Sequence, residues 1–463
     1  MSQRPNFLFI LIDDLGWRDL SCYGSTFYET PGLDRLAAEG MTFTDAYAAC
    51  PVCSPTRASL LTGRYPARVG VTNYIGGHST GRLIDAPYIR QLPLEEYNLA
   101  RALKAGGYVT WHVGKWHLGE APFYPQHQGF DVNIGGCHYG HPYKGYFAPW
   151  QIEHLPEGPD GEYLTDRITD EAIRLIRNHD GSKPFFLNLW HYAVHTPIQA
   201  KPEDIERFSR KAEAMGLDKQ QALVEGEHFP TDQKRHLRVM RRIIQSDPGY
   251  AAMVWNLDWN IGRVLDALRE TAQLDNTVVI FTSDNGGLAT AEGSPTSNRP
   301  LAEGKGWMYD GGTREPLIVR YPRLIQGGST CSVPVTSPDF YPTFLELAGL
   351  DPIPEQHCDG ESFVPLLRGG SQLRRDAIFW HYPHYGNQGG TPACAIRAGD
   401  WKLIEFFEDG RAELYNLRED ISESRNVAQD HPEKTNELKA RLAQWRKEVQ
   451  AKIPQPNPAY RPG

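Results

Sequence analysis

The chain has 463 residues, of which 40% are hydrophobic and 23% are charged, so it can bury a large core and is too long for one small domain. Its formal net charge is −9, whereas a nucleic-acid-binding protein carries a basic face, so we expect no nucleic-acid partner. The seven cysteines are odd in number and scattered, which argues against a disulfide framework.

A short apolar run opens the chain. Residues 7–12 are all apolar, and Asp13 and Asp14 follow them directly. This run is too short to span a bilayer and lacks the pattern of a secretory leader. We therefore predict a buried first strand over about residues 6–12, with no signal peptide and no membrane span. The expected location is cytoplasmic, or periplasmic or secreted if a leader was removed.

Apolar runs and helical patterns then alternate along the chain. The runs cover residues 108–113, 184–190, 277–282 and 316–320, and the helical patterns cover residues 32–39, 55–62, 94–105, 162–178, 248–272 and 336–348. Continuous apolar strands that alternate with helices are typical of a sheet covered on both faces. The pattern predicts an α/β fold with a large mixed, mostly parallel sheet flanked by helices.

Two segments interrupt this alternation. Residues 200–247 are charged and show helical spacing, so we predict a helical insertion that acts as a lid or outer layer. From about residue 376, short strand-like runs at 393–397, 401–406 and 412–417 precede an amphipathic helix near 431–451. We therefore expect a large α/β domain over residues 1–375 and a small subdomain over 376–463, built from an antiparallel sheet and a helix.

Polar clusters follow four of the predicted strands. They are Asp13-Asp14, Gly114-Lys115, His191 to His195, and Ser283-Asp284-Asn285. In open α/β sheets, ligands bind outside the carboxyl ends of the strands, so these clusters point to one rim.

The carboxylates of this rim are candidate metal ligands. Adjacent carboxylates repel each other unless a cation lies between them, and three carboxylates with one amide oxygen suit Ca²⁺ or Mg²⁺ better than zinc. The candidates are Asp13, Asp14, Asp284 and Asn285. Each pair could instead cap a helix or form a turn, since Asp and Asn favour those positions.

The run from Cys53 to Gly63 carries the strongest motif. It reads Cys-Ser-Pro-Thr-Arg-Ala-Ser-Leu-Leu-Thr-Gly and resembles the sulfatase signature, Cys-x-Pro-x-Arg-x-x-x-Leu-Thr-Gly. The segment from Gly114 to Gly119, His195-Thr196-Pro197 and the loop that contains Lys305 also resemble sulfatase segments. The resemblance covers most of the chain and implies a formylglycine-dependent sulfatase with an alkaline-phosphatase-like fold.

The resemblance also implies the cofactors and a partner. A formylglycine-generating maturation enzyme would oxidise Cys53 to Cα-formylglycine, whose hydrated gem-diol is the nucleophile in this family. The metal, expected to be Ca²⁺ with Mg²⁺ or Mn²⁺ as alternatives, would be held by Asp13, Asp14, Asp284 and Asn285 together with the modified Cys53.

Further roles follow from the same resemblance. Arg57 would orient the diol, while Lys115 and Lys305 would hold the sulfate oxygens. His195 would protonate the leaving alcohol, and His117 would deprotonate the second hydroxyl. His191 and His195 could instead bind a metal from a helix, but Pro184 and the aromatic run after it favour a strand and a loop, so we interpret His191 as structural.

The expected substrate is a sulfated small molecule or sugar, cleaved by an exo-acting sulfuric ester hydrolase. Candidate pocket residues are Tyr74, His78, Arg82, His138, Tyr139, His141, His384 and Asn387, and candidate stacking residues are Trp111, Trp116, Trp307 and Trp380. A phosphonate monoester or phosphodiester hydrolase of the same superfamily, and a non-catalytic glycan-binding protein, are alternatives. A Cys50–Cys53 redox pair is disfavoured because no thioredoxin-like unit surrounds it. The sequence does not predict the oligomeric state.

Overall fold

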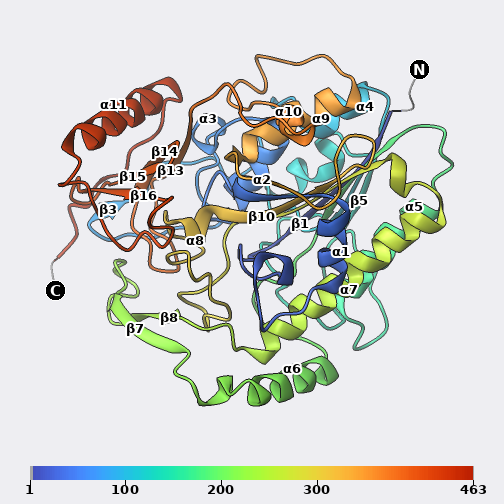
Figure 1. Ribbon diagram of the computed structural model, residues 1–463, viewed down its shortest axis with the longest axis horizontal. Helices are drawn as coiled ribbons and strands as arrows, with labels where there is room; N and C mark the ends of the chain where they lie inside the picture. Colours follow the sequence, from blue (N-terminus) through green and yellow to red (C-terminus); the bar gives the residue numbers. More distant parts are fainter. Residues whose placement is uncertain (1–3, 462–463) are drawn as a thin grey trace.

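A nine-stranded sheet lies at the centre of the computed structural model, which describes residues 4–461 (Figure 1). Its strands run in the order β11 (Ser329–Cys331), β2 (Met41–Tyr47), β10 (Arg314–Arg320), β9 (Thr277–Ser283), β1 (Asn6–Ile12), β6 (Phe185–Trp190), β4 (Val109–Gly114) and β5 (Val132–Ile134), and β12 (Val335–Thr336) pairs with β2. Only β10 runs antiparallel to its neighbours among these described strands. The prediction of a large mixed, mostly parallel sheet is confirmed.

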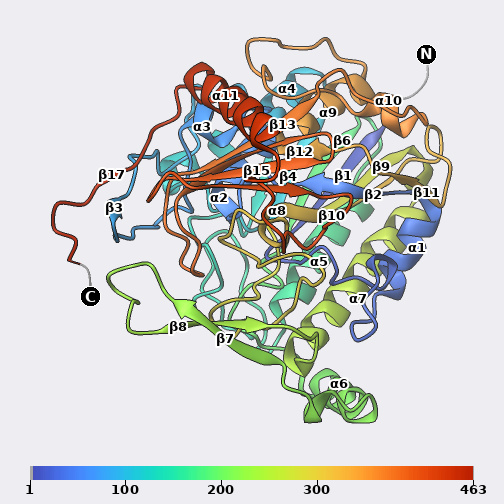
Figure 2. The same ribbon diagram turned by 60° about the vertical axis from the view of Figure 1, so that its left-hand side comes forward.

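Helices cover both faces of this sheet (Figures 1 and 2). One layer contains α1 (Pro31–Glu39), α5 (Leu164–Arg177) and α7 (Pro248–Glu270), and the other contains α2 (Cys53–Thr62), α4 (Leu99–Ala105), α9 (Phe340–Ala348) and α10 (Val364–Leu367). Phe7 and Phe9 of β1 pack on Phe344 and Phe340 of α9, with ring centroids 4.9 and 5.5 Å apart. Because both faces are covered, every residue of β1, β6 and β9 is buried, which explains their continuous apolar runs.

The four central parallel strands end at the same edge. Ile12 of β1 lies opposite Ser283 of β9, while Leu11 and Gly114 both lie opposite Trp190 of β6. Gly114 has a φ of +105°, and a Cβ there would lie 2.0 Å from the Trp190 carbonyl oxygen. Only glycine fits, so the chain can turn at this point and deliver Lys115 to the edge.

The C-terminal part forms a second, antiparallel sheet. Its strands are β13 (Ala377–Tyr382), β14 (Ala393–Ala398), β15 (Trp401–Phe406) and β16 (Ala412–Asn416), and α11 (Pro432–Glu448) packs on one face. The other face packs on Tyr47, Cys50 and Val52, just ahead of Cys53. The predicted small sheet with a helix is confirmed, although β13 was not predicted. Residues 1–3 and 462–463 of the two expected domains lie outside the described part.

The segment 200–247 differs from its prediction. It contains α6 (Pro202–Ala214) and then a hairpin of β7 (Leu223–His228) and β8 (Arg238–Arg242), so the helical prediction is wrong for its second half. Arg238 pairs with Glu225 at 2.9 Å and Arg241 with Glu227 at 2.6 Å across the hairpin. The charges that suggested a helix surface are cross-strand ion pairs, which stabilise a two-stranded sheet.

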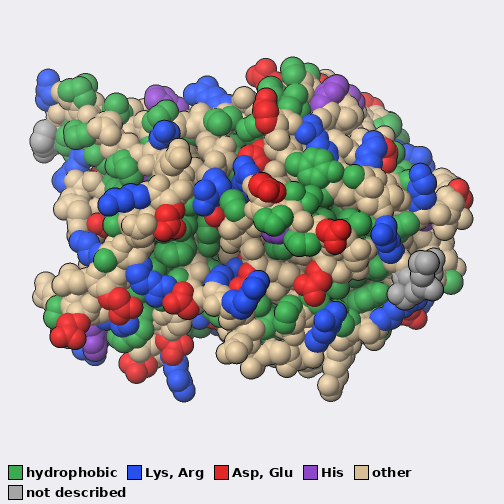
Figure 3. Space-filling view, turned by 90° about the horizontal axis from the view of Figure 1, so that it is seen from above, with side chains coloured by type: hydrophobic (Ala, Val, Ile, Leu, Met, Phe, Trp, Pro, Cys, Tyr) green, Lys and Arg blue, Asp and Glu red, His purple; other side chains and the backbone are tan. Residues whose placement is uncertain are grey.

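The short elements complete the chain. They are α3 (Pro66–Val69), α8 (Asp310–Thr313) and the pair formed by β3 (Leu83–Ile84) with β17 (Gln455–Pro456). No helix within residues 4–461 is long and apolar enough to cross a bilayer. On the face shown in Figure 3, acidic and basic side chains are interspersed.

Candidate active site

The polar clusters predicted to share a rim do lie together. Asp13 and Asp14 follow β1, Asp284 and Asn285 follow β9, and Lys115 follows β4. Asp13 Oδ2 accepts a hydrogen bond from Lys115 Nζ at 2.6 Å, Asp14 Oδ2 accepts one from Lys305 Nζ at 2.8 Å, and Asp14 Oδ1 accepts one from Asn285 Nδ2 at 2.8 Å. The ends of three strands separated in sequence, together with the loop that contains Lys305, therefore supply one buried cluster.

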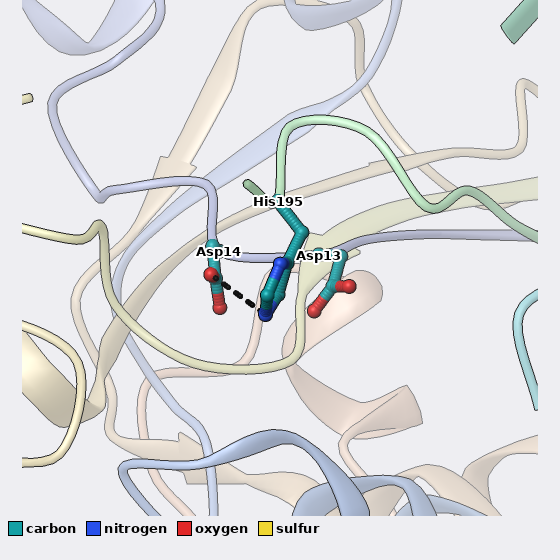
Figure 4. Close-up of side chains that lie close together, drawn as sticks. All are labelled: Asp13, Asp14 and His195. Carbon is teal, nitrogen blue, oxygen red and sulfur yellow. Dashed lines mark ion pairs between the residues drawn. The ribbon is translucent and has the colours of Figure 1, made fainter. Parts of the chain in front are cut away.

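His195 joins this cluster from the loop after β6. Ligand atoms of Asp13, Asp14 and His195 lie within 4.8 Å of one another. Figure 4 shows the His195 imidazole beside both carboxylates, with its Nε2 atom 3.6 Å from Asp14 Oδ2. The grouping brings the predicted carboxylates together, although His195 is more simply explained by its contact with Lys305.

The two adjacent carboxylates have opposite electrostatic environments. Burial and the charges of Asp284 and Asp14 raise the pKa of Asp13 well above its usual value, against the effect of Lys115. Burial also opposes ionisation of Asp14, but Lys305 lowers its pKa below the usual value. Lys305 thus stabilises the ionised form of Asp14, whereas Lys115 only partly offsets the effects that disfavour the ionised form of Asp13.

A divalent cation fits this arrangement. Asp13 Oδ1 and Asn285 Oδ1 are buried and have no hydrogen-bond donor among the described residues. Buried polar oxygens without donors are costly unless a cation binds them. Carboxylate and amide oxygens are hard ligands, so the residues present fit Ca²⁺ or Mg²⁺.

Cys53 is the first residue of α2, and its Sγ atom lies 3.3 Å from His117 Nδ1. In a formylglycine, oxygen atoms would take the place of this sulfur. His117 Nε2 donates to the Ile75 carbonyl oxygen at 3.0 Å, so Nδ1 carries the lone pair and faces residue 53. Burial raises the pKa of the Cys53 thiol, whereas a redox-active cysteine needs a lowered one, which argues against the redox interpretation.

Arg57 lies one helical turn after Cys53, on the same face of α2. Its Nε and Nη2 atoms lie 2.9 and 2.7 Å from Asp284 Oδ2, and Nη1 donates to the Lys115 carbonyl oxygen at 3.2 Å. The side chain is fully buried against Trp190. Arg57 therefore fixes Asp284 and the Lys115 turn relative to the start of α2.

His195 and Lys305 form a second proton-carrying pair. Lys305 Nζ donates to His195 Nε2 at 2.9 Å, and His195 Nδ1 donates to the Thr196 carbonyl oxygen at 2.9 Å. Burial and the Lys305 charge lower the pKa of His195 well below its usual value. Burial disfavours the charge of Lys305, but Asp14 raises the pKa of Lys305 above its usual value. The shared proton therefore resides on Lys305.

These groups form the floor of a cavity of about 450 Å³. Cys53, His117, His195 and Lys305 line the floor, and the walls include Tyr74, His141, Tyr143, Glu292, Asn387 and Gln388. Three of the predicted pocket residues, Tyr74, His141 and Asn387, are in the lining, whereas His78, Arg82, His138, Tyr139 and His384 are not. Tyr143, Glu292 and Gln388 were missed, because no motif surrounds them in the sequence.

Other predicted residues serve the core. The four candidate stacking tryptophans, Trp111, Trp116, Trp307 and Trp380, are at least 91% buried and none lines the cavity, so the stacking prediction is wrong. Their large apolar area is used in packing. His191 is fully buried and also does not line the cavity, in agreement with its structural interpretation.

A pocket with a candidate nucleophile at a helix start, a base beside it and a lysine at its floor defines a hydrolase of anionic esters. The family model named Sulfatase matches residues 5–350, and the model for the N-sulphoglucosamine sulphohydrolase C-terminal region matches residues 303–451. The chain therefore belongs to the sulfatase family, within the alkaline phosphatase superfamily, and is a sulfuric ester hydrolase.

Individual proteins agree with this assignment. An N-acetylgalactosamine-6-sulfatase from Canis lupus familiaris is 35% identical over 86% of this chain and 71% of its own length. A sulfatase from Formosa agariphila is 32% identical over 93% of this chain and 86% of its own. The crystal structure of Ps i-CgsB in complex with k-i-k-neocarrahexaose is 29% identical, with a TM-score of 0.77 over 96% of this chain and 93% of that one.

Proposed function

We propose that this protein is an exo-acting carbohydrate sulfatase that works through a formylglycine at position 53 and a divalent cation. The observation that carries the proposal is the position of residue 53. Its side chain lies 3.3 Å from the His117 Nδ1 atom, at the floor of a pocket that Lys305 also lines. A nucleophile, a base and a cation for the sulfate are thus within one small space.

Two observations support a sugar substrate. The similar canine protein is named for the 6-sulfate of N-acetylgalactosamine, and the similar solved structure contains k-i-k-neocarrahexaose, an oligosaccharide. The cavity, at about 450 Å³, is a small-molecule pocket rather than a long groove. A pocket of this kind favours a terminal sulfated residue, so we propose exo action.

Asp13, Asp14, Asp284 and Asn285, together with residue 53, would hold the cation, for which we propose Ca²⁺ over Mg²⁺ or Mn²⁺. When bound, a divalent cation supplies positive charge that favours the ionised form of a neighbouring hydroxyl. The formylglycine, made from Cys53 by a maturation enzyme, supplies two hydroxyls on one carbon when hydrated.

The remaining steps belong to the side chains of the chain itself. Lys115 and Lys305 hold the sulfate oxygens, and Arg57 keeps Asp284 and residue 53 in place. His117 Nδ1 takes a proton from the second hydroxyl of residue 53, which lets the sulfate leave, because the other nitrogen of His117 is already a donor to Ile75. The leaving oxygen receives its proton from the Lys305 Nζ and His195 Nε2 pair.

Mass spectrometry of the tryptic peptide of residues 36–57 tests this proposal. The protein would be produced with a formylglycine-generating enzyme and assayed on sulfated sugars and on paired 4-nitrophenyl sulfate and phosphonate esters. We expect an aldehyde at position 53 and hydrolysis of the sulfates. A preference for the phosphonate would favour the phosphonate hydrolase alternative. An aldehyde without hydrolysis of any ester would favour the glycan-binding alternative. An unmodified thiol with activity would refute the formylglycine nucleophile.

A further inference from the structure

One acidic side chain lines the same pocket as Lys305. Glu292 lines the cavity, in the loop between β9 and α8, and is exposed to solvent. Its backbone has a φ of 53°, in the left-handed region that non-glycine residues rarely adopt. Such a conformation persists only where surrounding contacts maintain it, and it often occurs at binding sites.

Contacts from two other parts of the chain fix the Glu292 carboxylate. Oε1 accepts hydrogen bonds from Asn387 Nδ2 at 2.7 Å and Gln388 Nε2 at 3.1 Å, and Oε2 accepts one from Thr196 Oγ1 at 3.4 Å. Lys234 in turn binds the far side of Asn387, at 2.6 Å to Oδ1 and 3.0 Å to the backbone oxygen. The carboxylate is thus held at the wall by uncharged partners that leave its negative charge in place.

The carboxylate of Glu292 therefore contributes its charge to the pocket. Glu292 lines the same cavity as Lys305. The pocket consequently carries charges of both signs, with Lys305 at the floor and Glu292 at the wall. A substrate whose sulfate binds at Lys305 has its ring further out in the pocket, where Glu292 lies at the wall.

Another part of the wall is aromatic. Tyr143 lines the cavity and is 57% exposed, which is unusual for so large a side chain. Its ring centroid lies 4.2 Å from that of His141, which in turn lies 5.7 Å from His195 in a stacked arrangement. An exposed aromatic face beside the leaving-group position offers a flat surface to an uncharged ring.

We propose that Glu292 determines specificity by excluding any substrate ring that carries a second anionic group beside the scissile sulfate. The pocket then selects sulfate monoesters of neutral sugars, which donate hydroxyl hydrogen bonds to Glu292 and lie against Tyr143. This inference rests on the proposed sulfatase function. Glu292 acts by repulsion, because a second negative charge next to its fixed carboxylate costs more binding free energy than a neutral hydroxyl gains by a hydrogen bond.

A matched substrate pair tests the inference on the mature enzyme. Sulfate release would be measured from methyl galactoside 6-sulfate and 4,6-disulfate, and from the corresponding N-acetylgalactosaminides. We expect kcat/KM for the monosulfate to exceed that for the disulfate by at least about tenfold. Glu292→Gln should reduce this ratio to roughly twofold and Glu292→Lys should invert it, mainly through KM for the disulfate.

Glu206→Gln is the control, because Glu206 is an exposed glutamate of α6 that does not line the cavity. It should keep the wild-type ratio. A wild-type enzyme that prefers the disulfate, or Glu292 variants that keep the wild-type ratio while hydrolysing sulfates, would overturn this inference alone. An aldehyde-bearing enzyme that cleaves no sulfate ester overturns the proposed function and this inference with it.

Discussion

At the scale of single residues, backbone carbonyls give two buried histidines opposite tautomers. His117 donates from Nε2 to Ile75 and presents Nδ1 to residue 53, whereas His195 donates from Nδ1 to Thr196 and presents Nε2 to Lys305. Burial lowers the pKa of both imidazoles, so both are neutral. One can therefore accept a proton from the nucleophile, while the other shares the proton of Lys305.

Replacing the nucleophile tests this arrangement directly. In Cys53→Ser, the single hydroxyl occupies the place of the attacking group, so the serine attacks sulfur once. Serine has no second hydroxyl from which to expel the sulfate, so the enzyme should remain sulfated at position 53. We expect turnover to fall by at least about a thousandfold, with one sulfate retained per chain by intact-mass spectrometry.

Cys50→Ala is the matched control for this prediction. Cys50 is buried three residues away, packs against the C-terminal sheet and does not line the cavity, so its removal should leave turnover near wild type. Full turnover by Cys53→Ser would refute the formylglycine reading.

Site residues that stand together in a sequence motif could be predicted from the sequence, and isolated site residues could not. Cys53 and Arg57 lie one helical turn apart, and Asp13-Asp14 and Asp284-Asn285 follow apolar runs, so motif and strand end coincide. Glu292 and Tyr143 come from loops whose sequences carry no motif. Their position depends on contacts such as Glu292 with Asn387, 95 residues away along the chain.

At the scale of elements, β13 shows how burial conceals a strand. Ile378 and Trp380 pack against the residues before Cys53, while Phe379 faces α11. Because both faces are covered, the polar alternation typical of an antiparallel strand is absent. In β7 and β8 the strands are instead concealed by exposed charges. Their cross-strand ion pairs use charged side chains that would equally suit the surface of a helix.

The histidine of β13 makes the fold sensitive to acid. His381 is buried, its Nε2 donates to the Lys452 carbonyl oxygen at 2.9 Å, and burial lowers its pKa to about 4. In the unfolded chain the imidazole of His381 binds a proton near pH 6.5. The native state therefore keeps this part of its stability above pH 6.5 and loses it as the pH falls towards 4. The loss in unfolding free energy is roughly 3 kcal/mol.

His381→Gln retains a donor for Lys452 and does not titrate, so its melting temperature should fall less than that of wild type between pH 7.5 and 4.5. Burial also lowers the pKa of His112 and His191 to about 3, so the loss should be reduced rather than abolished. His236→Gln, on an exposed side chain, is the control and should follow wild type. Equal slopes for wild type and His381→Gln would contradict the assignment.

At the scale of the whole molecule, the C-terminal sheet supports the active site. Trp380 Nε1 donates to the Ala48 carbonyl oxygen at 2.8 Å, five residues before Cys53. Asp310, five residues after Lys305, accepts hydrogen bonds from Lys402 Nζ at 2.7 Å and Tyr47 Oη at 2.9 Å. The segment before the nucleophile and the loop of the sulfate-binding lysine are thus both anchored to the second sheet.

Lys402 is the centre of this anchor, since it lies fully buried between Asp310 at 2.7 Å and Glu423 at 2.8 Å. Lys402→Met leaves the buried Glu423 carboxylate without its cation and removes one partner of Asp310, so we expect a loss of about 3–5 kcal/mol in unfolding free energy. Adding Glu423→Gln should restore more than half of the lost melting temperature, because Asp310 keeps Tyr47 and Arg314 as partners. Lys439→Met is the control. It removes a solvent-accessible pair between Lys439 of α11 and Glu405 of β15 and should cost less than about 1 kcal/mol.

Thermal unfolding and sulfate release would be measured together on these variants. Activity should fall with stability in Lys402→Met and recover in the double variant, because the anchor acts on Cys53 and Lys305 through their supports. Equal melting temperatures for Lys402→Met and Lys439→Met would show that the second sheet is not held by this buried triad.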